Sequence, residues 1–197
     1  MKSFISILAI PFLAFPLLAS GQIDPGPDGL GLYFDEDATQ VSAVVLEGTE
    51  SISAFLVLTN PTAEGNLNHW SAGVSAIQGA PGNAMVAGSP VVGHNLALNM
   101  PGSEHWVFEV AVGEDPPLPA AEVVVLAEIV IWPFVYDAPI PLFVTYGWEF
   151  GGYGTGEGGA SFNPSSGSWD LPVAVINGQA PVSVGSRTWD QIKATYR

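Results

Sequence analysis

The stretch that decides the fold class is residues 120–132, AAEVVVLAEIVIW. Val, Leu and Ile dominate it, and only Glu122 and Glu128 interrupt the apolar run. β-branched side chains lose conformational freedom in a helix but fit a pleated sheet. Because apolar residues fall on both alternating faces, we expect a strand in the middle of a sandwich that is covered on both sides. We expect this strand to end at Pro133, because proline has no N–H group to donate to a neighbouring strand.

A second apolar stretch follows at residues 139–150. Alternation places five of its side chains on one face, and these are Leu142, Val144, Tyr146, Trp148 and Phe150. We expect this stripe to be buried. We also expect the two stretches to form a long hairpin at the centre of an all-β core.

Short strands separated by turns rich in Gly and Pro are expected along the rest of the chain. They are residues 32–34, 42–47, 51–59, 69–77, 84–87, 91–92, 96–98, 105–112, 171–176 and 181–184. Asn177-Gly178 is a strong turn signal, and residues 151–159 are expected to be a flexible loop. The spacing predicts an all-β fold, an antiparallel two-sheet sandwich with no long helix in its body.

The first 21 residues are typical of a secretory signal. Lys2 gives a positive start, residues 4–18 are apolar, and Ala19-Ser20-Gly21 supplies small residues for cleavage. The apolar run is shorter than the about 20 residues of a spanning helix. We therefore expect a secreted protein (periplasmic, cell-surface or extracellular) with no membrane span after cleavage, a sandwich domain over residues 22–184 and a tail over residues 185–197.

The charge of the chain is strongly asymmetric. It has 4 basic and 19 acidic residues, and three of the basic ones lie in the last eleven positions. Without Lys2 the formal charge is 3 − 19 = −16. Such a body repels phosphate backbones, which excludes nucleic acid as a partner. The chain has no Cys, so its stability depends on burial and not on disulfides.

The last ten residues, TWDQIKATYR, predict a short amphipathic helix. Thr188 and Gln191 have the spacing of a capping box. Trp189, Ile192 and Tyr196 fall on one face. An isolated helix of this length is marginal in water, so it either docks on the body or frays.

Residues 30–61, which begin LGLYFDEDATQ and end AFLVLTNP, resemble the start of exported β-sandwich proteins of unknown role from uncultured bacteria. The tail resembles a C-terminal motif of those proteins, TWxxIKxxYR, although Asp190 stands where a small residue is expected. The resemblance implies an immunoglobulin-like or cohesin-like sandwich and no particular activity. It also implies sorting or surface attachment through Trp189, Ile192, Lys193, Tyr196 and Arg197. The alternative is a helix that packs its Trp and Tyr onto the sandwich.

Three acidic residues near the start of the domain suggest a calcium loop. Asp24, Asp28 and Asp35 are spaced like oxygen ligands around a Gly bend, which would suit a hard cation. However, Gly26 occupies a ligand position and two prolines stiffen the loop. The alternative is a solvated turn without any cofactor.

No convincing catalytic constellation is found, and we predict that the protein is not an enzyme. Residues 154–159 match GxGxxG, but no helix is expected after them. His69, His94 and His105 are scattered without metal-binding spacing. Glu109 and Glu128 could lie across neighbouring strands as a glycosidase pair, although any acidic sandwich offers such pairs.

Aromatic residues around the glycine-rich loop are the remaining candidates. Tyr153 and Trp169 lie in loop sequence, so we expect them to be an exposed pair, and exposed rings are able to stack on the faces of sugars. The leading prediction is a secreted, non-enzymatic structural or interaction protein with an unidentified protein or glycan partner. The alternative is a carbohydrate-binding module that uses these rings, with calcium as a stabiliser.

Overall fold

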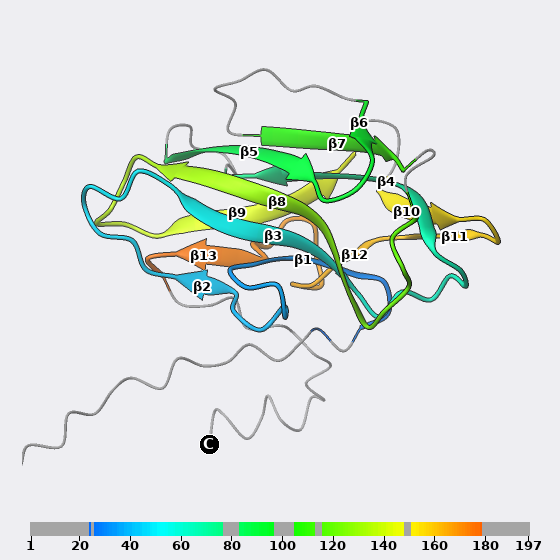
Figure 1. Cartoon of the computed structure of the whole chain (residues 1–197). Coiled ribbons are helices and arrows are strands. Elements are labelled where there is room, and N and C mark those ends of the chain that lie inside the picture. Colours follow the sequence, from blue (N-terminus) through cyan, green and yellow to red (C-terminus); the bar gives the residue numbers. More distant parts are fainter. Residues whose placement is uncertain are drawn as a thin grey trace, which may run out of the picture.

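The computed structural model describes residues 24, 26–76, 83–96, 105–112, 116–147 and 151–178. Within these residues the protein is all-β, without any helix, and its strands form two mixed sheets (Figure 1). The predicted all-β fold is confirmed. No helix in the described ranges is long and apolar enough to cross a membrane. The signal segment, Trp148, Phe150, the predicted strand 181–184 and the C-terminal tail lie outside the described residues.

The described residues contain thirteen strands. In order they are β1 (Gly29–Tyr33), β2 (Ser42–Ala43), β3 (Ile52–Thr59), β4 (Leu67–Ser75), β5 (Ala84–Pro90), β6 (His94–Asn95), β7 (His105–Ala111), β8 (Val123–Pro133), β9 (Ile140–Tyr146), β10 (Gly152–Thr155), β11 (Gly159–Ser161), β12 (Asn163–Pro164) and β13 (Ala174–Ile176). The predicted strands 51–59, 69–77 and 105–112 correspond closely to β3, β4 and β7.

The two sheets have different strand orders. The five-stranded sheet runs β12-β1-β3-β8-β5, and the larger one runs β11-β10-β4-β9-β13-β2, with β7 paired to β4 and to β6. Most pairs are antiparallel, but β1 pairs β12 and β13 pairs β2 in parallel. The prediction of a purely antiparallel sandwich is therefore wrong for these pairs. Both involve a strand of two residues, which is too short for an alternation pattern to reveal.

The decisive stretch is the strand β8, which lies between β3 and β5. Leu56 pairs with Ala127 and Val57 pairs with Val125, so Leu126 is the extra residue of a β-bulge. The bulge turns both Leu126 and Ala127 into the core. The opposite face is only partly covered, and Glu128 on it is exposed.

The predicted hairpin between this stretch and the next is wrong. β8 belongs to the five-stranded sheet, whereas β9 pairs with β4 and β13 in the larger sheet. The chain therefore crosses from one layer to the other after Pro133, and it turns through Pro139 before β9 begins. Alternation identified both strands, but it carries no information about which strand pairs with which.

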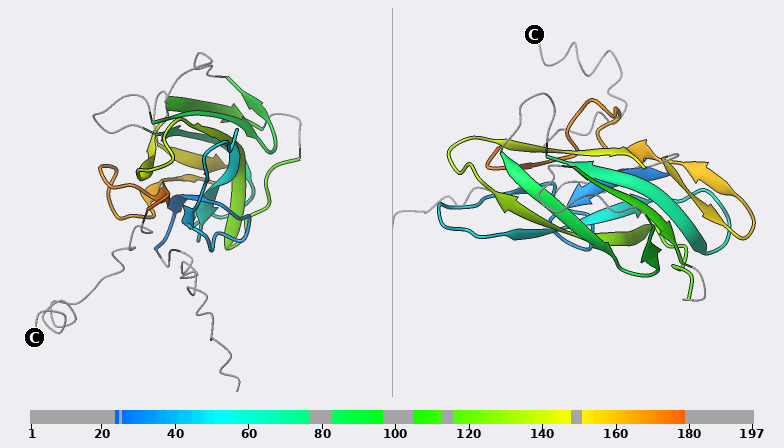
Figure 2. Two further views of the ribbon diagram at one scale, coloured as in Figure 1. Left: turned by 90° about the vertical axis from the view of Figure 1, so that its left-hand side faces the viewer. Right: turned by 90° about the horizontal axis from the view of Figure 1, so that it is seen from above.

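Both sheets contribute to one hydrophobic core. Its centre includes Leu56 and Ile129 from the smaller sheet and Leu142 from the larger one, all fully buried. Trp70 and Phe108 pack with ring centroids 5.1 Å apart. The end-on view in Figure 2 shows the strands arranged around this interior. Burial of this apolar surface is the main source of stability in a chain without Cys.

A second, smaller apolar cluster lies on the other face of the five-stranded sheet. Tyr33, Ala38 and Val57 are buried there, and Val123 and Val125 pack against them. Ala38 comes from the loop after β1, in which Asp35 accepts hydrogen bonds from the backbone N–H groups of residues 39 and 40. This loop covers part of the outer face of β8, so the prediction of cover on both sides is met only at that end.

The segment predicted as a flexible loop, residues 151–159, contributes to a hairpin instead. β10 and β11 pair with each other, and β10 also pairs with β4, so the hairpin extends the larger sheet (Figure 1). Thr155 holds the turn, because its Oγ1 accepts from the N–H groups of Glu157 and Gly158 at 3.2 and 3.1 Å. The same hydroxyl donates to Glu64 O at 2.7 Å, which ties the turn to the connection before β4.

Candidate functional site

Tyr153 is the first of the two predicted binding rings, and its predicted exposure is wrong. Its side chain is only 2 % exposed, and its ring packs on Phe162 with centroids 5.6 Å apart. The residue belongs to β10, whose pairing with β4 turns the ring into the core. The flanking glycines of the sequence GYGT indicated a loop, although here they accommodate close neighbours in the sheet.

The hydroxyl of Tyr153 is the centre of a buried hydrogen-bond cluster. It donates to Asp28 Oδ1 at 2.6 Å and accepts from the N–H groups of Thr62 and Ala63 at 2.9 and 3.1 Å. Asp28 also accepts from Thr62 N–H at 2.8 Å and from Thr62 Oγ1 at 2.7 Å. The cluster joins the start of β1 to the β3–β4 connection and to β10, and therefore links the two sheets.

This environment keeps the phenol neutral. Burial and the hydrogen bond to the Asp28 carboxylate raise the pKa of Tyr153 above its usual value. A neutral phenol can donate to the carboxylate and accept from the two amides at once. The arrangement satisfies polar groups inside the fold, and we assign Tyr153 a structural role.

Trp169 is the second predicted ring, and its partner at the surface is Tyr146. The two rings stack with centroids 4.2 Å apart and an angle of 26° between their planes. Tyr146 is 58 % exposed, so the expectation that the whole stripe 142–150 is buried is wrong at this residue. Tyr146 is the last residue of β9, where the strand leaves the core. The alternation of apolar residues continues to Phe150, so no local signal marked Tyr146 as the residue where the strand leaves the core.

The surroundings of this aromatic pair hold it in place. A Cβ atom on Gly151 would lie 2.6 Å from Cδ1 of Tyr146, so only glycine allows the ring to take this position. Trp169 packs its inner side against the main core. The turn that carries Trp169 is fixed by Ser166, whose hydroxyl shares its single hydrogen between the carbonyl oxygens of Ser168 and Leu171, both 3.0 Å from Oγ. The pair is therefore a preformed aromatic surface, with Tyr146 outermost.

The three predicted calcium ligands are each engaged in a separate turn. Asp24 accepts from Gly26 N–H at 2.9 Å, and Asp28 belongs to the Tyr153 cluster. Asp35 accepts from the backbone N–H and the hydroxyl of Thr39. In the part of the chain that the structure covers, no group of three or more His, Asp or Glu side chains could hold a metal ion. The geometry gives calcium no support.

The other candidate chemical groups are not brought together. Glu109 lies on β7 and Glu128 on β8, strands of different sheets that do not pair, so the proposed acid pair across neighbouring strands is wrong. The Glu128 carboxylate accepts instead from Ser53 Oγ at 3.3 Å. His69 and His94 flank Ala111 on either side of β7, and His105 lies at the other end of that strand. Burial lowers the pKa of His105.

No family model, curated protein or solved structure matches this chain. The candidate site therefore depends on the geometry of its own residues. The residues predicted to carry a sorting signal lie beyond the described ranges.

Proposed function

We propose that the protein is a secreted, non-enzymatic structural or interaction protein whose contact surface is centred on Tyr146 and Trp169. The observation that carries this proposal is the exposure of Tyr146, an aromatic ring that leaves the core and stacks on a second ring. Aromatic residues are enriched at binding interfaces because they bury a large area with little loss of side-chain entropy. The ring of Tyr146 is already stacked on Trp169 before any ligand binds, and such preorganisation lowers the cost of association.

The second candidate function is carbohydrate binding, with a glycan as the ligand of the Tyr146–Trp169 surface. Sugar rings present apolar C–H faces that stack on aromatic side chains, and their hydroxyls need polar partners nearby. The outer face of Tyr146 offers the stacking surface, and the exposed Asp170 follows Trp169 in the chain. A carboxylate is a strong acceptor for sugar hydroxyls.

Binding to a panel of immobilised glycans, followed by calorimetric titration of any positive glycan, tests the second candidate. Tyr146→Ala and Trp169→Ala should each weaken binding about tenfold or more, as expected for central aromatic contacts. Phe134→Ala is the matched control, because Phe134 is another exposed ring outside the pair. If glycan binding survives both substitutions, or is lost equally in the Phe134→Ala control, then the glycan does not bind at the Tyr146–Trp169 pair.

The leading proposal includes a particular type of sandwich and a role for the C-terminal tail. The sequence resemblance suggests an immunoglobulin-like or cohesin-like sandwich, and the spacing of polar and apolar residues in residues 188–197 suggests a short C-terminal helix. We propose that residues 188–197 sort the protein to the cell surface. Deletion of these residues should change where the protein is found, and a tail that acts only as a sorting signal should leave the melting temperature within about 2 °C. A truncated protein that reaches the same place but melts much lower would identify the tail as a packing element.

A further inference from the structure

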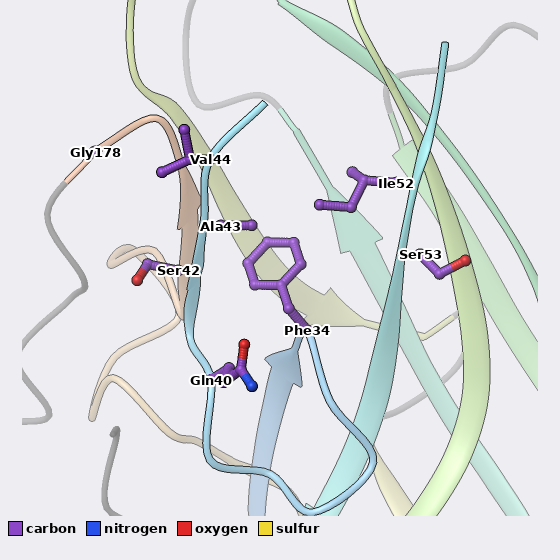
Figure 3. Close-up of a pocket in the computed structure, with 8 residues that line it drawn as sticks. All are labelled: Phe34, Gln40, Ser42, Ala43, Val44, Ile52, Ser53 and Gly178. Atoms are coloured by element: carbon purple, nitrogen blue, oxygen red, sulfur yellow. The ribbon is translucent and has the colours of Figure 1, made fainter. Parts of the chain in front are cut away.

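A groove of about 480 Å³ opens between two segments of the chain. One is β2 together with Val44, which follows it, and the other is the first two residues of β3, Ile52 and Ser53. Figure 3 shows the Phe34 ring lying between Ala43 on one side and Ile52 on the other. Phe34 and Ile52 are partly buried and pack against the main core. The floor of the groove is therefore an apolar extension of the interior that remains accessible.

The β2 side of the groove is an open strand edge. The carbonyl group of Val41 accepts from Val175 N–H in β13 at 3.0 Å, and that of Ala43 accepts from the N–H of Asn177, just after β13, at 2.8 Å. Val41 and Ala43 therefore direct these backbone groups away from the groove. Successive residues of a strand direct their N–H and C=O groups to opposite edges. Ser42 and Val44 therefore present theirs to the groove, where no strand of the described chain pairs with β2.

The β3 side is open as well, because β1 is shorter than β3. The last pair between them is Tyr33 with Phe55, and Ser53 lies beyond it. Leu30 directs its carbonyl toward the β12 side, where it accepts from Ser165 N–H at 2.8 Å. By alternation Tyr33 faces β3, and Phe55 and Ser53 direct their backbone groups to that same edge. Ser53 thus has no strand partner on this edge among the described residues.

Open strand edges above an apolar floor are suited to an added extended segment. Main-chain hydrogen bonds to the edges supply affinity, and alternate side chains fill the floor. An uncovered edge of this kind is also a liability for aggregation. Val44 and Leu46 increase that liability, since they are 76 % and 75 % exposed.

The C-terminal part of the same chain is well placed to cover the groove. Gly178, the last described residue, itself lines the groove, and residues 179–197 continue from it. The sequence predicts a strand at residues 181–184, PVSV, in which Val182 and Val184 share one face. A strand of four residues spans about 13 Å.

Charge also favours this segment as the occupant. The described body contains no Lys or Arg, whereas Arg187, Lys193 and Arg197 all follow Gly178. The loops that flank the groove carry exposed carboxylates, which are Glu36, Asp37, Glu47 and Glu50. Opposite charges on the body and the tail attract each other at low ionic strength.

We propose that residues 179–187 add to this groove as an extra strand in the same molecule. Val182 and Val184 point onto Phe34 and Ile52, Ser183 points outward, and the backbone pairs with the open edges at Ser42, Val44 and Ser53. Arg187 then lies near the acidic loops. This strand closes the gap between the sheets and anchors the following residues, 188–197, at this place on the body.

Amide hydrogen exchange measured by NMR tests this proposal. In the full chain the amides of Ser42, Val44 and Ser53 should exchange about tenfold or more slowly than in a chain that ends at Gly178. In case that chain does not fold, Val182→Asp combined with Val184→Asp in the full chain should remove the same protection. Ser183→Asp is the matched control and should keep it.

Fast exchange of the three amides in the full chain would mean that the groove stays empty. Protection that survives the double Asp substitution would mean that another segment covers it. Protection that appears only with rising protein concentration, together with dimers in solution, would assign the strand to a second copy.

Discussion

The hydroxyl group of Tyr153 joins three separate parts of the chain. It holds Asp28 and the backbone of Thr62 and Ala63 together at the point where both sheets meet. Tyr146, seven positions earlier, stacks on Trp169 at the surface. The two tyrosines therefore differ in role. Tyr153 points inward because β10 pairs with β4, whereas Tyr146 reaches the surface because β9 ends there.

The first prediction concerns Tyr153→Phe. Loss of the hydroxyl leaves the Asp28 carboxylate and the amide of Ala63 short of a partner inside the protein. The free energy of unfolding, measured by urea denaturation, should fall by about 1–3 kcal/mol. Tyr146→Phe removes a hydroxyl from an exposed ring and should change it by less than about 0.5 kcal/mol. Equal effects of the two substitutions would refute the structural role of the cluster.

The second prediction concerns alkaline pH. Burial, followed by the nearby Asp24 charge, raises the pKa of Tyr33 from 10.0 to about 12. Between these values the unfolded chain has lost the phenol proton and the folded chain has kept it, so the folded state binds more protons. Stability should therefore be unaffected by Tyr33 below pH 10 and should fall as the pH rises toward 12.

Thermal unfolding of the wild type and of Tyr33→Phe across this pH range measures the effect. The substitution removes the titrating group, so the decline in stability should be shallower in the variant. Parallel curves for the two proteins would show that Tyr33 titrates normally.

At the scale of the strands, the alternation of apolar and polar residues predicted where several strands lie along the chain. The strands predicted at residues 51–59 and 69–77 are present as β3 and β4, because the alternation of side chains can be recognised in a local sequence. Pairing was not predictable: β8 and β9 are adjacent in sequence but lie in different sheets. The hairpin β10–β11 was not predicted, because its glycines are compatible with a loop as well as with closely spaced strands. Its turn is fixed by the hydroxyl of Thr155, and a threonine alone is not a recognisable turn signal in a sequence.

The third prediction concerns the contact between β5 and β7. A Cβ atom on Gly88 would lie 2.5 Å from Cζ of Phe108 and 2.7 Å from Cδ1 of Ile129, so glycine allows the two sheets to approach here. Gly88→Ala should destabilise the protein by about 1–3 kcal/mol through overpacking. Gly156→Ala is the control, since no atom lies within 4 Å of the added Cβ. Chemical denaturation compares the two, and a neutral Gly88→Ala would contradict the close approach of the sheets.

At the scale of the whole molecule, the candidate site is a consequence of the crossing between sheets. Because the chain leaves the smaller sheet after β8, β9 enters the larger sheet beside β4 and β13, and its end reaches the turn that carries Trp169. The sequence predicted Tyr153 and Trp169 as an exposed pair, whereas the structure leaves Trp169 half-buried, stacks it on Tyr146 and buries Tyr153. The choice between Tyr146 and Tyr153 depends on tertiary neighbours, which no local pattern contains.

The crossing itself is tested most directly by cross-strand contacts measured with isotope-edited NMR. The structure predicts contacts of Ile129 with Ala54, of Ile131 with Val86, and between the rings of Tyr146 and Trp169. Contacts between residues 123–133 and residues 140–146 in the pattern of an antiparallel hairpin, without the ring contact, would contradict the two-sheet arrangement and the site that depends on it.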